Sequence, residues 1–233
     1  MTELGDVLFD QTAADRKVKG AFIFDMDGVI IDSEPLHFEA DRLTMERFGQ
    51  QVEQEDLEKY VGMTNPEMWQ LIREAYGMMG VELEELLACQ KSIKLERLFH
   101  DAWEPIEGIM ELLVSLHDTG VPMAVASSSP RWFIEGVLTR LGIASYFTYI
   151  ISGEEVERGK PSPDIYLEAA RFLGVKPEHC MVLEDSRNGV IAAKTAGMSC
   201  IGFVNPNSGQ QDLSLADYTV RKIIEVRKVI LEG

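Results

Sequence analysis

Short apolar segments alternate with amphipathic segments along the second half of the chain. The apolar segments predict strands at residues 123–126, 149–151, 181–183 and 199–203, and the segments between them predict helices at 131–141, 163–173 and 188–196. An earlier apolar run, Ala21–Phe24, predicts one more strand. Strands that alternate with helices are typical of a parallel sheet with helices on both faces. The sequence therefore predicts an α/β fold with a doubly wound, Rossmann-like parallel sheet.

A helical segment interrupts this pattern directly after the first strand. Apolar residues recur at helical spacing from Leu36 to Leu98, with breaks at Gly49, at 62–66 and at 77–80. We therefore predict an α/β core at residues 20–34 and 104–233 and an inserted all-helical unit at 35–103. Residues 1–19 are polar and without periodicity, and we expect an N-terminal extension there.

The composition excludes several classes of partner. The chain has 233 residues, a formal net charge of −17 and a pI near 4.6, which argues against nucleic acid and against an anionic membrane surface. No apolar run approaches the ~20 residues of a membrane span, and a secretory signal pattern is missing. Three widely spaced cysteines form no zinc or redox motif. We expect a cytoplasmic protein whose self-sufficient core favours a monomer.

Two carboxylates follow the first predicted strand. Asp25 and Asp27 are two residues apart, so strand alternation points both toward one small volume, and Gly28 lets the chain turn away. Like charges that close need a cation, or one of them must be protonated. An alternative is structural: Asp27–Gly28 between apolar residues is also the signature of a type I′ hairpin turn.

The other predicted strands end in polar groups as well. Ser127–Ser129, the loop 159–164 with Lys160, and Glu184–Asp185 should meet the two aspartates at the carboxyl edge of a parallel sheet. Each group has a structural alternative, as a helix cap or a solvated loop residue. Together they match a phosphate with a divalent cation: Mg²⁺ prefers hard oxygen ligands, with a lysine, hydroxyls and helix N–H groups for the phosphate oxygens. The candidate magnesium ligands are Asp25, Asp27, Glu184 and Asp185.

In order and spacing, these motifs resemble those of the haloacid dehalogenase superfamily. The resemblance rests on Asp25-Met-Asp-Gly-Val, Ser127, Gly159-Lys160-Pro-Ser-Pro-Asp164 and Leu183-Glu-Asp-Ser186, and it extends from Ala21 to Phe203. The run Ile31-Asp-Ser-Glu-Pro-Leu-His37 is similar to the subgroup that contains beta-phosphoglucomutase and small sugar-phosphate phosphatases. This resemblance implies that the helical unit is a mobile cap.

Residue chemistry and the resemblance together imply catalytic roles. A carboxylate with a reference pKa of about 3.9 is ionised at neutral pH, so Asp25 is the expected nucleophile, forming an aspartyl phosphate. Asp27 is the expected general acid and base, and we expect the nearby carboxylate and partial burial to raise its pKa. Ser127, Ser128 and Lys160 are expected to bind the phosphate and neutralise its charge.

Phosphatase and phosphomutase are both compatible with these motifs. His37 and Lys91 fall near a histidine and a cap lysine of beta-phosphoglucomutase. However, Asn65 stands where the mutase has a phosphate-binding arginine, and Asp41 where it has a tryptophan. We therefore favour a phosphatase, with the mutase as the alternative. The expected substrate is a small sugar or polyol phosphate, and the cap residues expected to contact it are His37, Thr64, Asn65 and Lys91.

The two aspartates are also compatible with two other hypotheses, a dehalogenase and a phosphorylated sensor. A dehalogenase shares the nucleophile but does not need Asp27 or a metal site at Asp185. A sensor phosphorylated on Asp25, like a receiver domain, would share the acidic site and the lysine but lack a cap of about 65 residues. Rapid metal-dependent turnover of p-nitrophenyl phosphate would distinguish the enzyme from the sensor.

Overall fold

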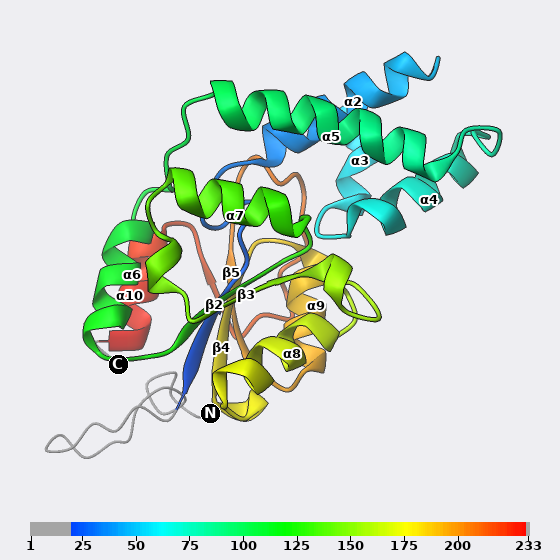
Figure 1. Ribbon diagram of the computed structural model, residues 1–233. Helices are drawn as coiled ribbons and strands as arrows, with labels where there is room; N and C mark the ends of the chain where they lie inside the picture. The colour runs from blue at the N-terminus through cyan, green and yellow to red at the C-terminus, as the bar shows by residue number, and fades with distance from the viewer. Residues whose placement is uncertain (1–19, 232–233) are drawn as a thin grey trace, which may run out of the picture.

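A six-stranded parallel sheet forms the centre of the molecule. The computed structural model describes residues 20–231, so the extension predicted for 1–19 lies outside the described residues. In space the strands run in the order β3-β2-β1-β4-β5-β6 (Figure 1). Their bounds are β1 Ala21–Phe24, β2 Met123–Ser127, β3 Tyr149–Ser152, β4 Cys180–Glu184, β5 Ser199–Phe203 and β6 Tyr218–Val220. The first strand in sequence is thus central, and Phe24 is in register with Val125 of β2 and Leu183 of β4.

Helices cover both faces of the sheet. The apolar side chains of β1 point alternately to the two sides, so each face has an apolar surface that a helix layer buries. Phe22 and Phe24 pack into one apolar core, and Ala21 and Ile23 pack into another. On one face lie α6 Ile109–Asp118, α7 Arg131–Arg140 and α10 Ile223–Leu231, and on the other lie α8 Asp164–Leu173 and α9 Arg187–Thr195 (Figure 1). Short 3₁₀ turns complete the connections at η2 Ala144–Tyr146, η3 Gly153–Glu155 and η4 Pro177–His179. The fold class predicted from the sequence is confirmed.

A helical unit lies over the carboxyl edge of the sheet (Figure 1). It contains α2 Glu34–Arg47, α3 Gln54–Leu57, η1 Glu58–Tyr60, α4 Asn65–Ala75 and α5 Leu83–His100. A third apolar core, built around Met45, Trp69, Ile72 and Leu86, holds these helices together. We call this unit the cap. Its predicted boundaries at residues 35 and 103 stay a prediction.

Three elements were missing from the predicted alternation: α6, β6 and α10. The strand β6 has three residues, of which Tyr218 and Thr219 are exposed, so it carries little of the apolar signal that marks an inner strand. The other helix and strand bounds differ from the predicted ones by one or two residues, which is the normal uncertainty at element ends. Over residues 20–231, none of the helices combines the length and the apolar character needed to cross a bilayer.

Candidate active site

The first strand delivers two aspartates to the carboxyl edge of the sheet. Asp25 follows β1 directly, and its backbone N–H donates to the carbonyl of Leu183 at 3.0 Å. Gly28 has φ +75°, and a Cβ at this position would overlap the carboxylate of Asp185. The hairpin alternative for Asp27–Gly28 is wrong, since β1 pairs with parallel strands on both sides. The glycine lets the loop turn where a second acidic residue approaches.

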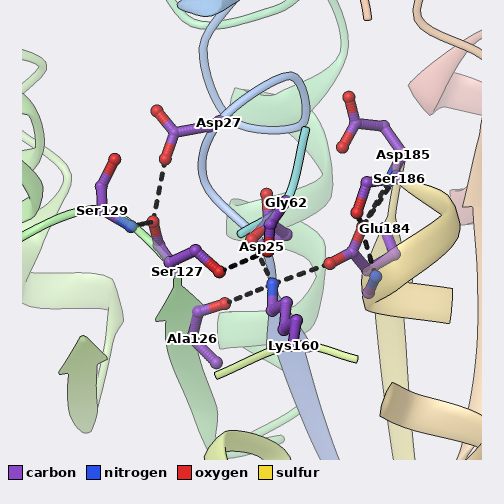
Figure 2. Close-up of polar contacts among 12 residues, drawn as sticks. Asp25, Asp27, Gly62, Ala126, Ser127, Ser129, Lys160, Glu184, Asp185 and Ser186 are labelled. Carbon is purple, nitrogen blue, oxygen red and sulfur yellow. Dashed lines mark hydrogen bonds and ion pairs between the residues drawn. The ribbon is translucent and has the colours of Figure 1, made fainter. Parts of the chain in front are cut away.

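Lys160 connects the aspartate of β1 to the end of β4. Its ammonium donates to Asp25 Oδ1 at 2.6 Å, to Glu184 Oε1 at 2.7 Å and to the Ala126 carbonyl at 3.1 Å (Figure 2). Its side chain is 1% exposed. Burial lowers the pKa of Lys160, but the two carboxylates outweigh burial and raise it overall. Lys160 is therefore a permanently charged ammonium at the centre of the site.

Glu184 uses both of its carboxylate oxygens in hydrogen bonds. Oε1 accepts from Lys160 and from the Tyr166 hydroxyl, and Oε2 accepts from the backbone N–H groups of Asp185 and Ser186 and from the Ser186 hydroxyl. A Cβ on Gly189 would overlap this carboxylate. Glu184 is thus a fixed acceptor that holds Lys160 and the loop after β4.

Asp25 and Asp185 form the part of the acidic cluster with free ligand capacity. One oxygen each of Asp25, Glu184 and Asp185 lies within 4.8 Å of the others. Burial raises the pKa of Asp25; Lys160 opposes this, and Glu184 and Asp27 add to it. Burial, followed by the charges of Glu184 and Glu34, raises the pKa of Asp185, which also accepts from the Ser208 hydroxyl.

These oxygens fit a divalent cation. Buried carboxylates of the same sign are hard ligands that lack sufficient positive charge in the described residues, and a bound cation would favour their ionised forms. The side chain of Asp27 does not belong to the cluster, because its oxygens face other partners. An oxygen of Glu184 lies in the cluster, but Glu184 could bind a cation only by giving up some of its hydrogen bonds to Lys160, Tyr166 and the loop after β4.

Asp27 lies on the other side of the site and is held by three side chains. Oδ1 shares a hydrogen bond of 2.7 Å with His37 Nε2 and accepts from Ser33 at 2.6 Å, and Oδ2 accepts from Ser127 at 2.9 Å (Figure 2 shows the last). Burial alone would raise the pKa of Asp27, but the charge and hydrogen bonds of His37 and the hydroxyls outweigh it and lower the pKa. The predicted rise is wrong because it omitted His37 and Ser33.

The serine loop after β2 faces both aspartates and the cap. Ser127 Oγ donates to Asp27 and accepts from the backbone N–H of Ser129 at 3.0 Å. Ser128 Oγ donates to the carbonyl of Gly62 in the cap at 2.7 Å. The Ser128 hydroxyl thus joins the cap to the core, whereas Ser127 lies beside the acidic groups.

Further contacts fix the cap segment 58–67 on the core. Asn188 Nδ2 donates to the Val61 carbonyl at 2.9 Å, and the backbone N–H of Gly159 donates to Glu67 Oε1 at 3.2 Å. A Cβ on Gly159 would overlap Glu67. The cap therefore touches core loops next to the residues Ser127, Lys160 and Asp185.

One pocket lies between the cap and these loops. It is lined by Asp25, Asp27 and Asp185 from the core and by His37 and Asn65 among the predicted cap residues. Thr64 and Lys91 are not among the lining residues. Thr64 instead donates to Glu67 at 2.6 Å, as part of the α4 capping box, and the Lys91 ammonium lies 5.4 Å from the centre of the Trp132 ring. The expectation that these two residues contact the substrate stays a prediction.

Sequence reasoning missed several residues of the site. Lys94 lines the pocket one turn after Lys91, Ser208 contacts Asp185, and Tyr166 contacts Glu184. Ser208 could have been found by the rule used for the other strands, because the polar run 205–208 follows β5 at the same sheet edge. Lys94 and Tyr166 carried no comparable signal, since each lies within a helix pattern.

Residues 22–203 match the model of the haloacid dehalogenase-like hydrolase family. The chain is 34% identical over 217 residues to the phosphorylated carbohydrates phosphatase of Thermotoga maritima, which covers 91% of this chain and 98% of that protein. It is 32% identical to the fructose-1-phosphate phosphatase YqaB of Escherichia coli over 180 residues, or 77% of this chain and 93% of that protein.

The architecture is similar to that of a solved mutase as well. The beta-phosphoglucomutase of Clostridium difficile superimposes with a TM-score of 0.77 at 26% identity, covering 89% of this chain and 92% of that one. The similarity to both kinds of enzyme extends over core and cap together, so it includes the helical unit as well as the acidic edge of the sheet.

Proposed function

The chain belongs to the haloacid dehalogenase-like hydrolase family, and from this premise we propose that it is a Mg²⁺-dependent phosphatase of a small sugar or polyol phosphate, acting through an aspartyl phosphate on Asp25. Its curated relatives are phosphatases of small phosphorylated compounds, and it is a phosphoric monoester hydrolase. The observation that carries the proposal is the buried Lys160, which joins Asp25 to Glu184 at the edge of the pocket.

Asp25 is the proposed nucleophile. Its carboxylate attacks phosphorus, the bond to the leaving oxygen breaks, and water then cleaves the acyl phosphate. Lys160 supports this role, since an ammonium at 2.6 Å stabilises the carboxylate before attack and can neutralise phosphoryl oxygens afterwards. Ser127 and the backbone N–H groups of the loop 127–129 are proposed to bind the other phosphoryl oxygens.

Asp27 is the proposed acid and base. Its lowered pKa makes it a carboxylate in this arrangement, which suits removal of a proton from the attacking water. For the first step the leaving oxygen needs a proton, and we place that proton on the hydrogen-bonded pair of Asp27 and His37. The pair borders the pocket, so either partner can face the leaving group.

Asp25 and Asp185 are the proposed side-chain ligands of Mg²⁺. A divalent cation there would add positive charge next to the phosphoryl oxygens, and it would favour the ionised form of the nucleophile. Glu184 is proposed to position Lys160 and the loop of Asp185, because its own oxygens are already hydrogen-bonded.

The test is direct detection of the covalent intermediate. Full-length enzyme with Mg²⁺ and a phosphate ester is quenched in acid, and intact mass is measured. We expect an added phosphoryl mass in the wild type, none in Asp25→Asn, and turnover of p-nitrophenyl phosphate reduced by at least about 10³-fold in that variant. Asp32→Asn is the matched control, since Asp32 lies in the same loop but outside the pocket. An Asp25→Asn enzyme that keeps wild-type kinetics would contradict the proposal.

The same preparation separates the alternatives. Isomerisation of beta-glucose 1-phosphate in the presence of a trace of its bisphosphate, faster than phosphate release, would assign a mutase. A stoichiometric phosphoprotein that persists for hours without turnover would assign a sensor. Phosphate release that is faster than isomerisation and leaves no long-lived phosphoprotein would assign the phosphatase.

A further inference from the structure

Four polar residues of the cap line the pocket opposite the core loops. Glu34 and Asp41 come from α2, Asn65 from the start of α4 and Lys94 from α5. We call these four residues the polar wall. Glu34, Asp41 and Lys94 are 6%, 5% and 2% exposed, so the wall lies inside the molecule and is not an exposed charged surface.

Gln90, behind the wall, fixes two of these side chains. Its Nε2 donates to Asp41 Oδ1 and, at 3.3 Å, to Asn65 Oδ1. Lys94 Nζ donates to the same Asn65 oxygen at 3.3 Å. These bonds orient the wall in a structure without ligand, and they use one oxygen of Asp41 and one of Asn65.

The remaining polar atoms of the wall have no hydrogen-bond partner among residues 20–231. Among the described residues, Lys94 has one hydrogen bond for its three N–H groups. Asp41 Oδ2, the Glu34 carboxylate and Asn65 Nδ2 have no protein partner in the same residues. These four residues line the pocket, so their unpaired atoms are available to hydrogen-bond a ligand that enters it.

The polar atoms without a partner include donors on Lys94 and Asn65 and acceptors on Asp41 and Glu34. A hydroxyl group both donates and accepts, so neighbouring hydroxyls on a carbon chain can satisfy Lys94, Asn65, Asp41 and Glu34 together. A second phosphate or a carboxylate could accept from Lys94, but it would face two carboxylates that need donors. The wall therefore suits a neutral polyhydroxylated group better than a second anion.

We infer that, if the phosphatase function proposed above holds, the polar wall selects monophosphates whose leaving group carries neighbouring hydroxyls and no second anionic group. Asp41 and Glu34 accept from these hydroxyls, and Lys94 and Asn65 donate to them. The wall contacts the part of the substrate that leaves, whereas Asp25 and Lys160 act on the phosphoryl group. Affinity for hydroxyls and hydrolysis can therefore be measured separately.

The experiment compares two esters of equal length, a hexitol 6-phosphate and n-hexyl phosphate, with full-length enzyme and Mg²⁺. We expect wild-type kcat/KM to be at least about 10²-fold higher for the hexitol ester, because the hexyl chain leaves buried polar groups unpaired. Lys94→Met should reduce this preference at least about tenfold. Lys176→Met is the control: it removes a lysine of the core whose side chain is 75% exposed, and it should leave both values unchanged.

Asp41→Asn gives a second test that does not depend on the stability of Lys94→Met. The substitution removes one negative charge with little change of shape. The ratio of kcat/KM for hexose 1,6-bisphosphate to kcat/KM for the hexitol 6-phosphate should therefore rise about tenfold. Equal wild-type rates on the two six-carbon esters, an unchanged preference in a folded Lys94→Met, or a preference for phosphoethanolamine over the hexitol ester would each overturn the inference. Turnover of p-nitrophenyl phosphate by the wild type tests the phosphatase function itself, independently of these ratios.

Discussion

At the scale of single residues, we expect Lys160 to contribute to both stability and catalysis. Its ammonium is the hydrogen-bonding partner of two buried carboxylates, Asp25 and Glu184. Removing one member of a buried ionic cluster leaves the other members without compensation, and this costs about 3–5 kcal/mol. The same removal withdraws positive charge from the place where a phosphoryl group would react.

Lys160→Met should therefore lower the free energy of unfolding by about 3–5 kcal/mol and kcat by at least about 10²-fold. Urea unfolding and steady-state kinetics measure the two effects. Lys176→Met is the control, because the side chain of Lys176 is 75% exposed and should change neither value. If Lys160→Met is fully active, charge neutralisation by this lysine is not part of the mechanism.

The sequence predicts which residues meet at the strand ends, but it does not predict the directions in which their pKa values shift. Parallel strands bring their carboxyl ends together, so Asp25, Lys160 and Asp185 could be predicted to meet from order alone. The lowered pKa of Asp27 depends on Ser33, in the turn after β1, and on His37, in α2. Nothing in the residue spacing indicates that geometry.

At the scale of elements, the start of α4 links the cap to the loop of Lys160. Glu67 is the third residue of this helix; it completes the capping box with Thr64 and accepts from the backbone N–H of Gly159. A capping residue contributes about 1 kcal/mol to helix stability wherever it lies. At this helix the same carboxylate also holds the cap next to the loop that contains Lys160.

We expect Glu67→Ala to reduce kcat/KM about tenfold or more in addition to a loss of about 1 kcal/mol of stability. The control is Glu85→Ala, since Glu85 occupies the equivalent position in the capping box of α5 but lies away from the core. It should lose similar stability and keep its kinetics. Equal kinetics in the two variants would show that the contact with Gly159 has no role in turnover.

The helices of the cap could be predicted, but not which of their polar residues face the pocket. The breaks predicted at Gly49, at 62–66 and at 77–80 fall between the helices of the cap, which end and begin near them. The buried face of α5 includes Gln90 and Lys94, two polar residues that an apolar pattern cannot assign. The resemblance to beta-phosphoglucomutase indicates Lys91, whereas Lys94 is the lysine of α5 that lines the pocket.

At the scale of the whole molecule, we expect the acidic pocket to link metal binding to stability. The pKa values of Asp25 and Asp185 are raised, mainly by burial, so the metal-free protein takes up protons at these sites when it folds. A raised carboxyl pKa contributes stability that is complete below the unfolded value of about 3.9 and is lost as pH rises through the folded value.

The Tm in EDTA should therefore fall as pH is raised from 5.5 to 8, and added Mg²⁺ should restore more of it at pH 8 than at pH 5.5. Scanning calorimetry at the two pH values measures both effects. Asp185→Asn should show a smaller fall in EDTA and a smaller gain from Mg²⁺. A gain from Mg²⁺ that is equal in the variant and the wild type would place the cation elsewhere.

The position of β1 in the sheet has a consequence during synthesis on the ribosome. This strand is entirely apolar and buried, yet its neighbours are β2 and β4, about 100 and 160 residues further along the chain. In a nascent chain both edges of Ala21–Phe24 therefore stay unpaired until β2 has emerged, and the edge that pairs with β4 stays unpaired until residue 183 has emerged. Such long-range pairing is slow and exposes strand edges to aggregation, so we expect the strand that supplies Asp25 to benefit from chaperone protection before release.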